Sequence, residues 1–447
     1  MNSTFGKIST GTLITNDMNV KNQKQTEIGL VPESWKRILI SDLGEIITGT
    51  TPKTIERKYY KNGKYHFIAP GDIGLTTQIY NTEKVITEEG LKVSRVLPKY
   101  STCFVCIGST IGKVGISTQE QSTTNQQINA VVPSDRYDPF YVCYLLKYWS
   151  EYLSSFSSPS PVPIMSKGKF QQITIYASQD NAEQIKIAKI LKTIDQAIEL
   201  QDKLIATTTE LKQAAMEQLF TKGLHGEKQK ETEIGLVPES WKVVSLGNVS
   251  SMKNGVNFSR GERGSGTLTI DVLNMFSKTA TVDCSKLYRI NKKLAPDFIL
   301  KDQDILFVRS SLKQEGVGWS ALFRSINEPV TFCGFLIRCR LSNSEINPDF
   351  LVYYLRLPAT RSYLVSLSGK VAITNISQSV LQNLPIPMPK LSEQKEIAEQ
   401  LQILDQKISI HEGKRKTLQE LFQSLLNQLM TGEIRVNDLE IDVSEIS

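Results

Sequence analysis

The feature that most constrains this fold is an exact internal repeat. The stretch TEIGLVPESWK occupies residues 26–36 and returns unchanged at residues 232–242. The offset is 206 residues, counted from Trp35 to Trp241 (241 − 35). Identity of that length does not arise by chance, and a repeat on this scale governs how the rest of a chain is interpreted. We therefore expect two copies of one structural unit.

Weaker echoes extend the duplication along the chain. Asp138-Pro139 and Asn347-Pro348 each precede an apolar run, and a capping residue followed by proline is typical of a helix start. Further on, the two copies match with an offset of 210 residues (393 − 183). The segments with this offset are Glu183-Gln184 through Asp195 and Glu393-Gln394 through Asp405, and Gln171-Gln172-Ile173 is echoed by Gln382-Asn383-Leu384 at an offset of 211 (382 − 171). Each copy thus ends in the same helical sequence.

Those two helical sequences carry apolar residues that step alternately by four and three. Such a heptad pattern drives two helices to coil around each other. It predicts two long antiparallel helices that form a rigid spacer. The residues expected to pack between them are Ile187, Leu191, Ile194, Ile198 and Leu219 in the first helix and Ile397, Leu401, Leu404, Ile408 and Leu429 in the second.

Polar residues interrupt both heptad patterns at the same place. Gln201 and His411 are equivalent positions (411 − 210 = 201), and Lys212 and Arg415 follow nearby. A polar residue at a core position can fix the register of a coiled coil; the alternative is that the packing simply loosens there. Either way, His411 is interpreted as a register or surface residue rather than a metal ligand.

The segments between the repeat and the helices predict mixed α/β structure. Apolar runs indicate strands at residues 103–107, 114–117 and 128–132 in the first copy and at 268–273, 305–308 and 335–341 in the second. Asn62-Gly63, between residues 58–61 and 64–67, predicts a β-hairpin, because this dipeptide favours the tight turn that a hairpin needs.

Composition excludes some classes of protein and leaves others open. No apolar run reaches the roughly 18 residues of a membrane span, and residues 1–24 resemble a mobile tail rather than a signal peptide, so we expect a cytoplasmic location. The net charge of +6 permits a polyanionic partner without requiring one. Cys103 and Cys106 form a C-x-x-C, but they lie in a strand-like run where an odd offset puts them on opposite faces. We interpret them as structural thiols.

Three catalytic motifs come close and fail. Gly108 to Lys113 resembles a phosphate-binding loop, but its spacing is one residue short, Val114 replaces the Ser/Thr, and a strand follows where a helix is needed. Asn347-Pro348-Asp349-Phe350 resembles an amino-methyltransferase motif, but Asp349 breaks it. With three histidines, none duplicated, no histidine-based triad or metal cluster can be proposed.

The two copies differ most in basic, amide and hydroxyl residues of their loops. Such residues suit contacts to phosphates and base edges of DNA; the alternative is that each is simply a solvated loop residue. The candidates are Lys53, Arg57, Lys58, Lys61, Lys64, Ser109, Thr110 and Lys113 in the first copy, and Asn257, Arg260, Arg263, Arg309, Ser310, Ser311 and Lys313 in the second.

Taken together, these motifs resemble the specificity subunit of type I restriction-modification enzymes. The resemblance covers residues 25–431 and rests on the order arm, helix, arm, helix. The motifs that carry it are residues 28–35 and 234–241, Ala69 to Gly74, Gly108 to Gly115, Thr124 to Ala130, and the helix openings at Glu183-Gln184 and Glu393-Gln394. The second arm departs from the pattern where Arg309-Ser310-Ser311-Leu312-Lys313 replaces Gly-Ser-Thr-Ile-Gly-Lys.

The resemblance implies an α+β fold with two mixed α/β target recognition domains, separated by two long antiparallel coiled-coil spacer helices in a pseudo-two-fold duplication. The expected segments are an N-terminal tail (1–24), the first target recognition domain (25–180), the first helix (181–222), a linker (223–230), the second domain (231–390), the second helix (391–431) and an acidic tail (432–447). It adds Asn125, Gln126, Lys167, Lys169 and Lys370 to the DNA-binding candidates.

The implied function is recognition of a split, asymmetric site in double-stranded DNA, without catalysis by this chain. Two methyltransferase subunits and ATP-dependent restriction subunits would be its partners. S-adenosylmethionine, ATP and Mg would belong to those partners, so the chain itself would hold no cofactor and no metal. The alternative is a stand-alone tandem DNA-processing enzyme whose active site has not been recognised.

Overall fold

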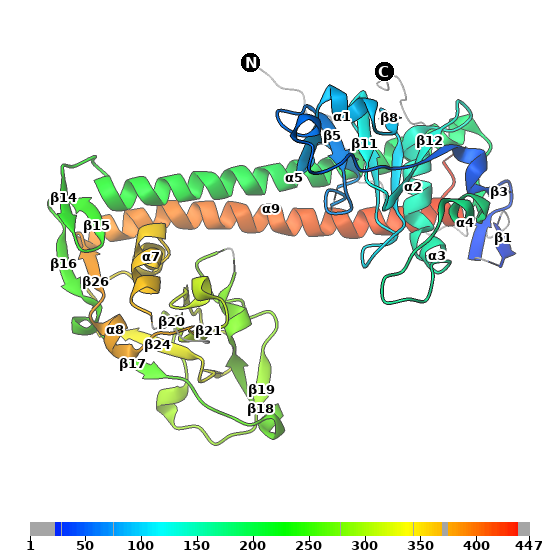
Figure 1. Cartoon of the computed structure of the whole chain (residues 1–447). Coiled ribbons are helices and arrows are strands. Elements are labelled where there is room, and N and C mark those ends of the chain that lie inside the picture. Colours follow the sequence, from blue (N-terminus) through cyan, green and yellow to red (C-terminus); the bar gives the residue numbers. More distant parts are fainter. Residues whose placement is uncertain are drawn as a thin grey trace, which may run out of the picture. The chain divides into compact units, whose positions relative to one another are not determined.

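The computed structural model describes residues 23–27, 29–74, 76–277, 279–342, 344–368 and 374–436. The chain divides into two compact units, the first made of residues 1–200 with 415–447 and the second of residues 201–414. Two long helices, α5 (Asn181–Lys222) and α9 (Leu391–Thr431), each contribute one stretch to each unit. Figure 1 shows these helices packed along each other, as the heptad pattern predicted.

The first unit is built on two sheets. The larger has the order β4-β12-β9-β10-β6 and the other the order β7-β5-β11-β8, while β1 pairs with β2 and β3 with β13. The strands are β1 (Gln23–Thr26), β2 (Gly29–Pro32), β3 (Lys36–Leu39), β4 (Gly44–Thr48), β5 (Tyr65–Ile68), β6 (Gln78–Ile79), β7 (Lys84–Ile86), β8 (Val96–Pro98), β9 (Thr102–Val105), β10 (Val114–Ser117), β11 (Gln121–Thr124), β12 (Ile128–Pro133) and β13 (Thr174–Ala177).

Short helices pack against both sheets of the first unit, α1 against β7 of the smaller sheet and α4 against β4 of the larger one. Among them, α2 packs against β9 and β10. Their bounds are α1 (Glu88–Lys92), α2 (Pro139–Tyr148), α3 (Ser150–Ser154) and α4 (Lys167–Gln172). Asp138 accepts a hydrogen bond from the Tyr141 backbone N–H at the start of α2, and Pro139 follows it, as predicted for this helix start.

The second unit repeats this plan. Its larger sheet has the order β17-β24-β20-β22 and its smaller one β19-β18-β23, with the pairs β14-β15, β16-β26 and β21-β25. The strands are β14 (Gln229–Thr232), β15 (Gly235–Pro238), β16 (Lys242–Ser245), β17 (Ser250–Asn254), β18 (Arg263–Ile270), β19 (Tyr288–Ile290), β20 (Ile305–Val308), β21 (Ser310–Ser311), β22 (Ser320–Leu322), β23 (Val330–Phe332), β24 (Leu336–Leu341), β25 (Thr374–Asn375) and β26 (Pro385–Met388). Its short helices are α6 (Pro348–Leu355), α7 (Pro358–Ser366) and α8 (Gln378–Gln382).

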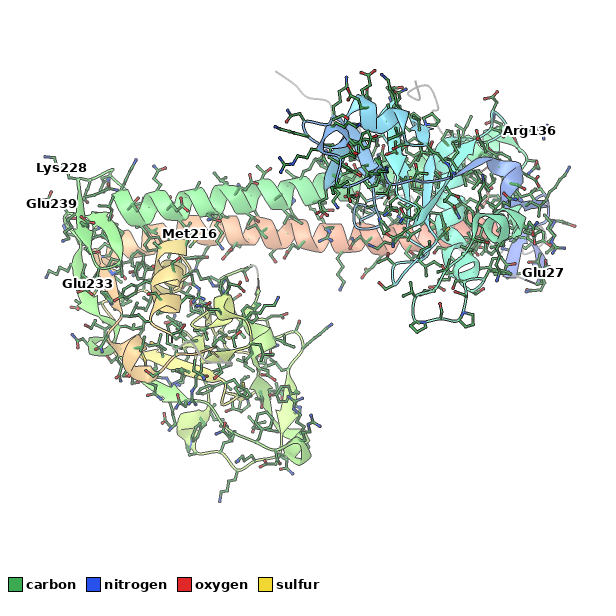
Figure 2. The ribbon with its side chains drawn as sticks, viewed as in Figure 1. Glu27, Arg136, Met216, Lys228, Glu233 and Glu239 are labelled. Carbon is green, nitrogen blue, oxygen red and sulfur yellow. The ribbon has the colours of Figure 1, made fainter. Side chains whose placement is uncertain are left out.

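The repeated eleven-residue stretch has the same structural role in both units. It supplies the last residue of the first strand, the turn and the second strand of a hairpin, β1-β2 or β14-β15, whose turns contain Glu27 and Glu233, both labelled in Figure 2. The tryptophan that follows is buried in each copy and meets an aromatic ring edge-on near the start of α2 or α6. The ring centroids are 6.1 Å apart for Trp35 and Tyr141 and 5.9 Å apart for Trp241 and Phe350.

In each unit the two long helices complete the core. In the first unit Ile187 and Leu191 of α5 share a hydrophobic cluster with Leu429 of α9. In the second, Leu219 joins Ile397 and Leu401, together with Met216, which Figure 2 labels on α5. The first part of α5 packs against the last part of α9, and the last part of α5 packs against the first part of α9. The two helices are therefore antiparallel. The remaining packing candidates are Ile198 and Ile408, which are buried, and Ile194 and Leu404, which are partly buried.

The polar interruption of the heptad pattern forms a contact. Nδ1 of His411 lies 2.8 Å from Oε1 of Gln201, so the two equivalent residues hydrogen-bond to each other. Of the two interpretations left open by the sequence, this contact favours the one in which polar residues fix the helix register.

The cysteine prediction is confirmed, and the hairpin prediction is wrong. Cys103 and Cys106 are buried in different hydrophobic clusters, on opposite faces of the strand. Residues 57–59 form a short 3-10 helix instead of a strand. The reason is that β5 pairs with β11, more than fifty residues further on, and with β7, which leaves the Asn62-Gly63 turn without a hairpin partner.

Several expected segment limits fall inside secondary structure. Gln23 and Lys24 belong to β1, and the preceding part of the expected tail lies outside the described residues. Strand β14 begins at Gln229, within the expected linker. After α9, Val436 is buried and Arg435 forms a 3.0 Å ion pair with Glu183; residues 437–447 lie outside the described part of the chain.

Candidate nucleic-acid interface

The loops that differ between the copies gather at one end of the larger sheet in each unit. In the first unit the register pairs Thr48 with Asn129 and Val105 with Ile128. Strands β4 and β9 therefore end where β12 and β10 begin. The loops 49–53, 106–113 and 125–127 leave the sheet at this place, and we call them the first loop edge.

The same construction appears in the second unit. Asn254 pairs with Ile337 and Val308 with Leu336, so β17 and β20 end where β24 begins. The loops 255–257, 309–319 and 333–335 form the second loop edge. Residues 125–127 and 333–335 are matching positions, because each triplet directly precedes the strand that pairs with the end of β9 or β20.

A glycine at the same repeat position lets two loops cross closely at each edge. Gly49 and Gly255 are 206 residues apart (255 − 49), and each directly follows a strand of the larger sheet. A Cβ on Gly49 would lie 2.2 Å from the Asn125 carbonyl oxygen, and one on Gly255 would lie 2.0 Å from that of Cys333. Only glycine fits such a backbone approach.

Amide side chains dominate the centre of the first loop edge. The Thr51 hydroxyl donates to Oε1 of Gln126 at 2.6 Å. Nδ2 of Asn125 donates to Oε1 of Gln127 at 2.9 Å, and Oδ1 of Asn125 accepts from the Gln127 backbone N–H at 3.0 Å. These contacts hold the three amides in place while Gln126 stays exposed. An oriented amide can both donate to and accept from an adenine edge.

A fourth segment joins this edge and carries two of the candidate lysines towards it. The Gly108 N–H donates to the Pro163 carbonyl at 3.0 Å, and the Met165 N–H donates to the Cys106 carbonyl at 2.9 Å. Helix α4 starts two residues later with Lys167 and Lys169 on its exposed side. Exposed Lys113, next to β10, lies at the same edge.

The basic segment 57–64 is only partly connected to the first loop edge. The Tyr60 hydroxyl donates to the Pro52 carbonyl at 2.6 Å, which keeps Arg57 and Lys58 beside the loop that holds Lys53. Strand β5 runs parallel to β11, and the C-terminal end of β11 leads into Asn125. The C-terminal end of β5 therefore lies towards the first loop edge. Lys61 and Lys64 precede β5 and so lie at its opposite end.

Backbone contacts organise the second loop edge. The Arg309 N–H donates to the Phe335 carbonyl at 2.7 Å, and the Arg309 carbonyl accepts from the Ile376 N–H at 2.9 Å. The Ser310 hydroxyl donates to Oδ1 of Asn375. Asn257, Ser311 and Lys313 complete the edge, with Asn257 and Lys313 exposed. Lys370 lies outside the described residues.

Two further arginines of the second arm, Arg260 and Arg263, differ in their contacts with other side chains. The Arg263 guanidinium lies over the Tyr288 ring at 4.1 Å and forms a 3.3 Å ion pair with Asp271. Arg260, three residues earlier, is exposed in a short 3-10 helix. The Arg263 guanidinium is therefore engaged within the arm.

One cysteine lies in each loop edge, Cys106 in the first and Cys333 in the second. Burial raises the pKa of the Cys106 and Cys333 thiols to about 12, so neither is a thiolate nucleophile at neutral pH. Within the described ranges, no group of three or more His, Cys, Asp and Glu side chains is arranged to hold a metal ion. No helix in the part of the chain that the structure describes is both long and apolar enough to cross a membrane.

Three residues of the loop edges were not among the DNA-binding candidates predicted from the sequence. Thr51 and Gln127 became visible only through the hydrogen bonds that they form with Gln126 and Asn125. Phe335 stands where the first copy has Gln127, which only the strand register reveals. Gln127 and Phe335 share one sequence signal, because each directly precedes an apolar strand, whereas Thr51 has no such signal.

Duplicated arms that carry different basic, amide and hydroxyl residues at one sheet end have the chemistry of a DNA-reading protein. A family model described as the type I restriction modification DNA specificity domain matches residues 32–210 and 238–420, and the chain belongs to this family. It is a DNA specificity subunit of a type I restriction-modification system, with two target recognition domains and no catalytic role of its own.

Full-length relatives agree with the family. The chain is 28% identical over 417 residues to the type I restriction enzyme MjaVIII specificity subunit of Methanocaldococcus jannaschii, covering 92% of this chain and 95% of that one. The crystal structure of a type I restriction-modification S subunit from M. genitalium matches with a TM-score of 0.60 at 16% identity, covering 89% of this chain and 96% of that one. A chain solved in a study of complex assembly of the type I system matches with a TM-score of 0.50 at 15% identity, covering 90% and 99%.

Proposed function

We propose that the two loop edges each read one half of a split, asymmetric site in double-stranded DNA. The observation that carries this is the retention of one sheet frame with two different sets of loop residues at its end. The same frame explains why both arms address DNA alike, and the different loops explain why the half-sites differ. DNA as the substrate also favours action in the cytoplasm.

Within the first arm, the proposed DNA contacts fall into two groups, one to phosphates and one to base edges. Lys53, Lys113, Lys167 and Lys169 supply positive charge for phosphates, with Arg57 and Lys58 beside them. Ser109, Thr110, Asn125 and Gln126 supply donors and acceptors for base edges. Lys61 and Lys64 are left out of the proposed interface because they lie at the other end of β5.

Within the second arm, Arg260, Arg309 and Lys313 are the proposed phosphate contacts. Asn257, Ser310 and Ser311 are the proposed polar base contacts, although the Ser310 hydroxyl already donates to Asn375. Arg263 acts chiefly within the arm, through Asp271 and Tyr288. Lys370 stays a candidate from the sequence alone.

The long helices are the proposed docking surface for two methyltransferase subunits. Large apolar side chains are exposed on both helices at equivalent repeat positions: Leu200 with Ile410, and Leu211 with Leu421 (410 − 200 = 421 − 211 = 210). Each unit thus carries one such residue from each helix, Leu200 with Leu421 and Leu211 with Ile410. Two equivalent apolar surfaces fit two copies of one partner.

Restriction subunits complete the proposed complex. S-adenosylmethionine, ATP and Mg are assigned to the methyltransferase and restriction subunits. We propose the segment limits given by the sequence, with the first target recognition domain at 25–180 and the second at 231–390, and with the long helices as the shared spacer. The limit at 25 falls within β1, whose hairpin starts two residues earlier, at Gln23.

The test is to map methylated adenines by sequencing DNA from a host that expresses this chain with its neighbouring methyltransferase. We expect one split, asymmetric motif that disappears when the chain is deleted. Exchanging residues 309–313 for the matching loop of a relative should change one half of the motif and leave the other intact. Methylation that is the same without the chain would contradict the proposal, and the purified chain would then be assayed for catalysis.

A further inference from the structure

The second loop edge contains a groove whose apolar side chains have no role in the function described so far. It has a volume of about 740 Å³ and is lined by Val272, Phe276, Ser310, Ser311, Leu312, Lys313, Glu315, Gly316, Trp319 and Phe335. Leu312 is 87% exposed, Phe335 60% and Phe276 45%. Large apolar side chains gathered in the open usually mark a binding surface.

We propose that this groove recognises thymine by its C5-methyl group, so that the second arm reads a T·A pair through apolar contact with Leu312 and Phe335. The inference rests on the proposed function, because it takes the second loop edge to face DNA. It adds the base and the chemistry by which one arm recognises it.

Strand register supports a difference in reading chemistry between the arms. Phe335 directly precedes β24 as Gln127 directly precedes β12, and both strands pair with the end of the neighbouring central strand. Gly334 then matches exposed Gln126. The second arm has therefore replaced a pair of amides by a side chain that offers only apolar surface, next to a residue that offers none.

Charges around the groove fit the edge of a base pair near the DNA backbone. Exposed Lys313 lies in the groove wall and Arg309 precedes the same loop, so cations are available for phosphates. Glu315 also lines the groove. A carboxylate is repelled by phosphates but accepts hydrogen bonds from base amino groups. The groove therefore suits base edges, with the backbone at its rim.

Among the four bases, thymine is the one that presents an apolar group in the major groove of DNA. Its methyl group is contacted by aromatic and aliphatic side chains, whereas the other base edges present donors and acceptors. Where Leu312 and Phe335 face the base edge, they would leave those polar groups without partners, at a cost that disfavours other bases. The groove thus selects for thymine and against its competitors.

Replacing thymine by uracil removes only the methyl group and keeps every hydrogen-bonding atom. The experiment uses the full complex of this chain with its methyltransferase subunits and DNA duplexes that carry the mapped site. Each half-site is synthesised with thymine or with deoxyuridine, and the dissociation constant is measured for every duplex. In one half-site we expect deoxyuridine to weaken binding about fourfold per contacted methyl, which corresponds to about 0.8 kcal/mol.

Protein variants show whether the groove is responsible. Leu312→Ala and Phe335→Ala should weaken binding to thymine DNA and reduce the deoxyuridine effect to less than about twofold. Leu273→Ala is the matched control, since Leu273 is also 87% exposed but does not line the groove. It should keep both the affinity and the deoxyuridine effect. All three side chains are exposed, so folding is little affected.

The proposal is overturned if deoxyuridine is tolerated in both half-sites, or if its effect is the same in the wild-type complex and in the Leu312 and Phe335 variants. The second result would assign the methyl contact elsewhere and leave the groove to a protein partner. Failure of the proposed function looks different, because the wild-type complex would then bind the mapped site no better than unrelated DNA.

Discussion

The buried contact between Lys212 and Asp405 gives the sharpest test of how the second arm is attached to the long helices. Lys212 of α5 and Asp405 of α9 lie 2.5 Å apart, and both are buried. The other oxygen of Asp405 accepts from the Tyr353 hydroxyl at 2.8 Å and from the Ala280 N–H at 3.0 Å. One carboxylate therefore joins α5, α9, α6 and a loop of the arm.

We expect Asp405→Asn to lower the stability of this region by about 3 kcal/mol. An asparagine oxygen can still accept from Tyr353 and Ala280, but its NH₂ group would face the Lys212 ammonium. Breaking one partner of a buried pair costs about 3–5 kcal/mol, because the other charge is left buried and unpaired. Burial lowers the pKa of Lys212 in spite of the nearby carboxylate, so part of that cost is relieved by deprotonation.

The repeat supplies a matched control in the first unit. Asp195 is equivalent to Asp405 and is also buried, but the residue equivalent to Lys212 is Phe422 (212 + 210). The Tyr144 hydroxyl donates to Asp195 at a longer 3.3 Å. Asp195→Asn breaks no ion pair with a lysine at this position, and we expect it to cost less than about 1 kcal/mol.

Native-state hydrogen exchange, resolved by peptide mass spectrometry, measures both effects in one molecule. A loss of about 3 kcal/mol should raise the exchange of the slowest amides in residues 397–408 about 150-fold. Amides of residues 187–198 serve as the internal reference. Changes of less than about fivefold for Asp405→Asn, or equal changes for the two variants, would refute the reasoning.

Four further outcomes are expected. Burial raises the pKa of four cysteine thiols to about 12, those of Cys106, Cys143, Cys333 and Cys339. Iodoacetamide at pH 8 should therefore modify half-buried Cys284 first in the native chain. Peptide mapping that finds Cys333 modified equally fast would contradict this. Gln201→Ala should cost about 1 kcal/mol through loss of its hydrogen bond to His411, seen as faster exchange in residues 198–205, and no change would show that the contact is not formed in solution. Lys113→Ala should reduce the slope of log binding constant against log salt by about 0.9, whereas Lys64→Ala should leave it unchanged; the reverse pattern would move the interface to the other end of β5. Leu211→Glu should reduce the number of methyltransferase subunits in native mass spectrometry from two to one, with exposed Gln213→Glu as the control, and retention of both subunits would exclude this docking surface.

The fold class was predictable because its signals are local or repeated. Heptads from Ile187 to Leu219 and from Ile397 to Leu429 predict the helix pair, and the fold confirms it. Strands β10 and β20 coincide with the predicted runs because each is a short apolar segment bounded by polar loops. Because the chain is duplicated, the fold predicted for one arm is also predicted for the other.

Interactions between residues far apart in sequence were not predictable in the same way. Asn62-Gly63 favours a hairpin locally, but β5 takes β11 as its partner, and no nearby residue reveals that choice. The equivalence of Gln127 and Phe335 depends on strand register, because the sequences around them no longer resemble each other. The apolar groove depends on Phe276 and Leu312, 36 residues apart in sequence (312 − 276), lining the same pocket.

The close crossing at Gly49 and Gly255 has a consequence for how such a protein can evolve. These glycines and the strands beside them hold the loop edges on a fixed frame, while residues such as Lys113, Gln126 and Leu312 stand outside the packed core. A mutation at an exposed position usually changes stability by no more than about 0.5 kcal/mol. Many can accumulate before a margin of about 5–15 kcal/mol is exhausted. A lineage can therefore acquire a new DNA target through a series of viable intermediates, one arm at a time.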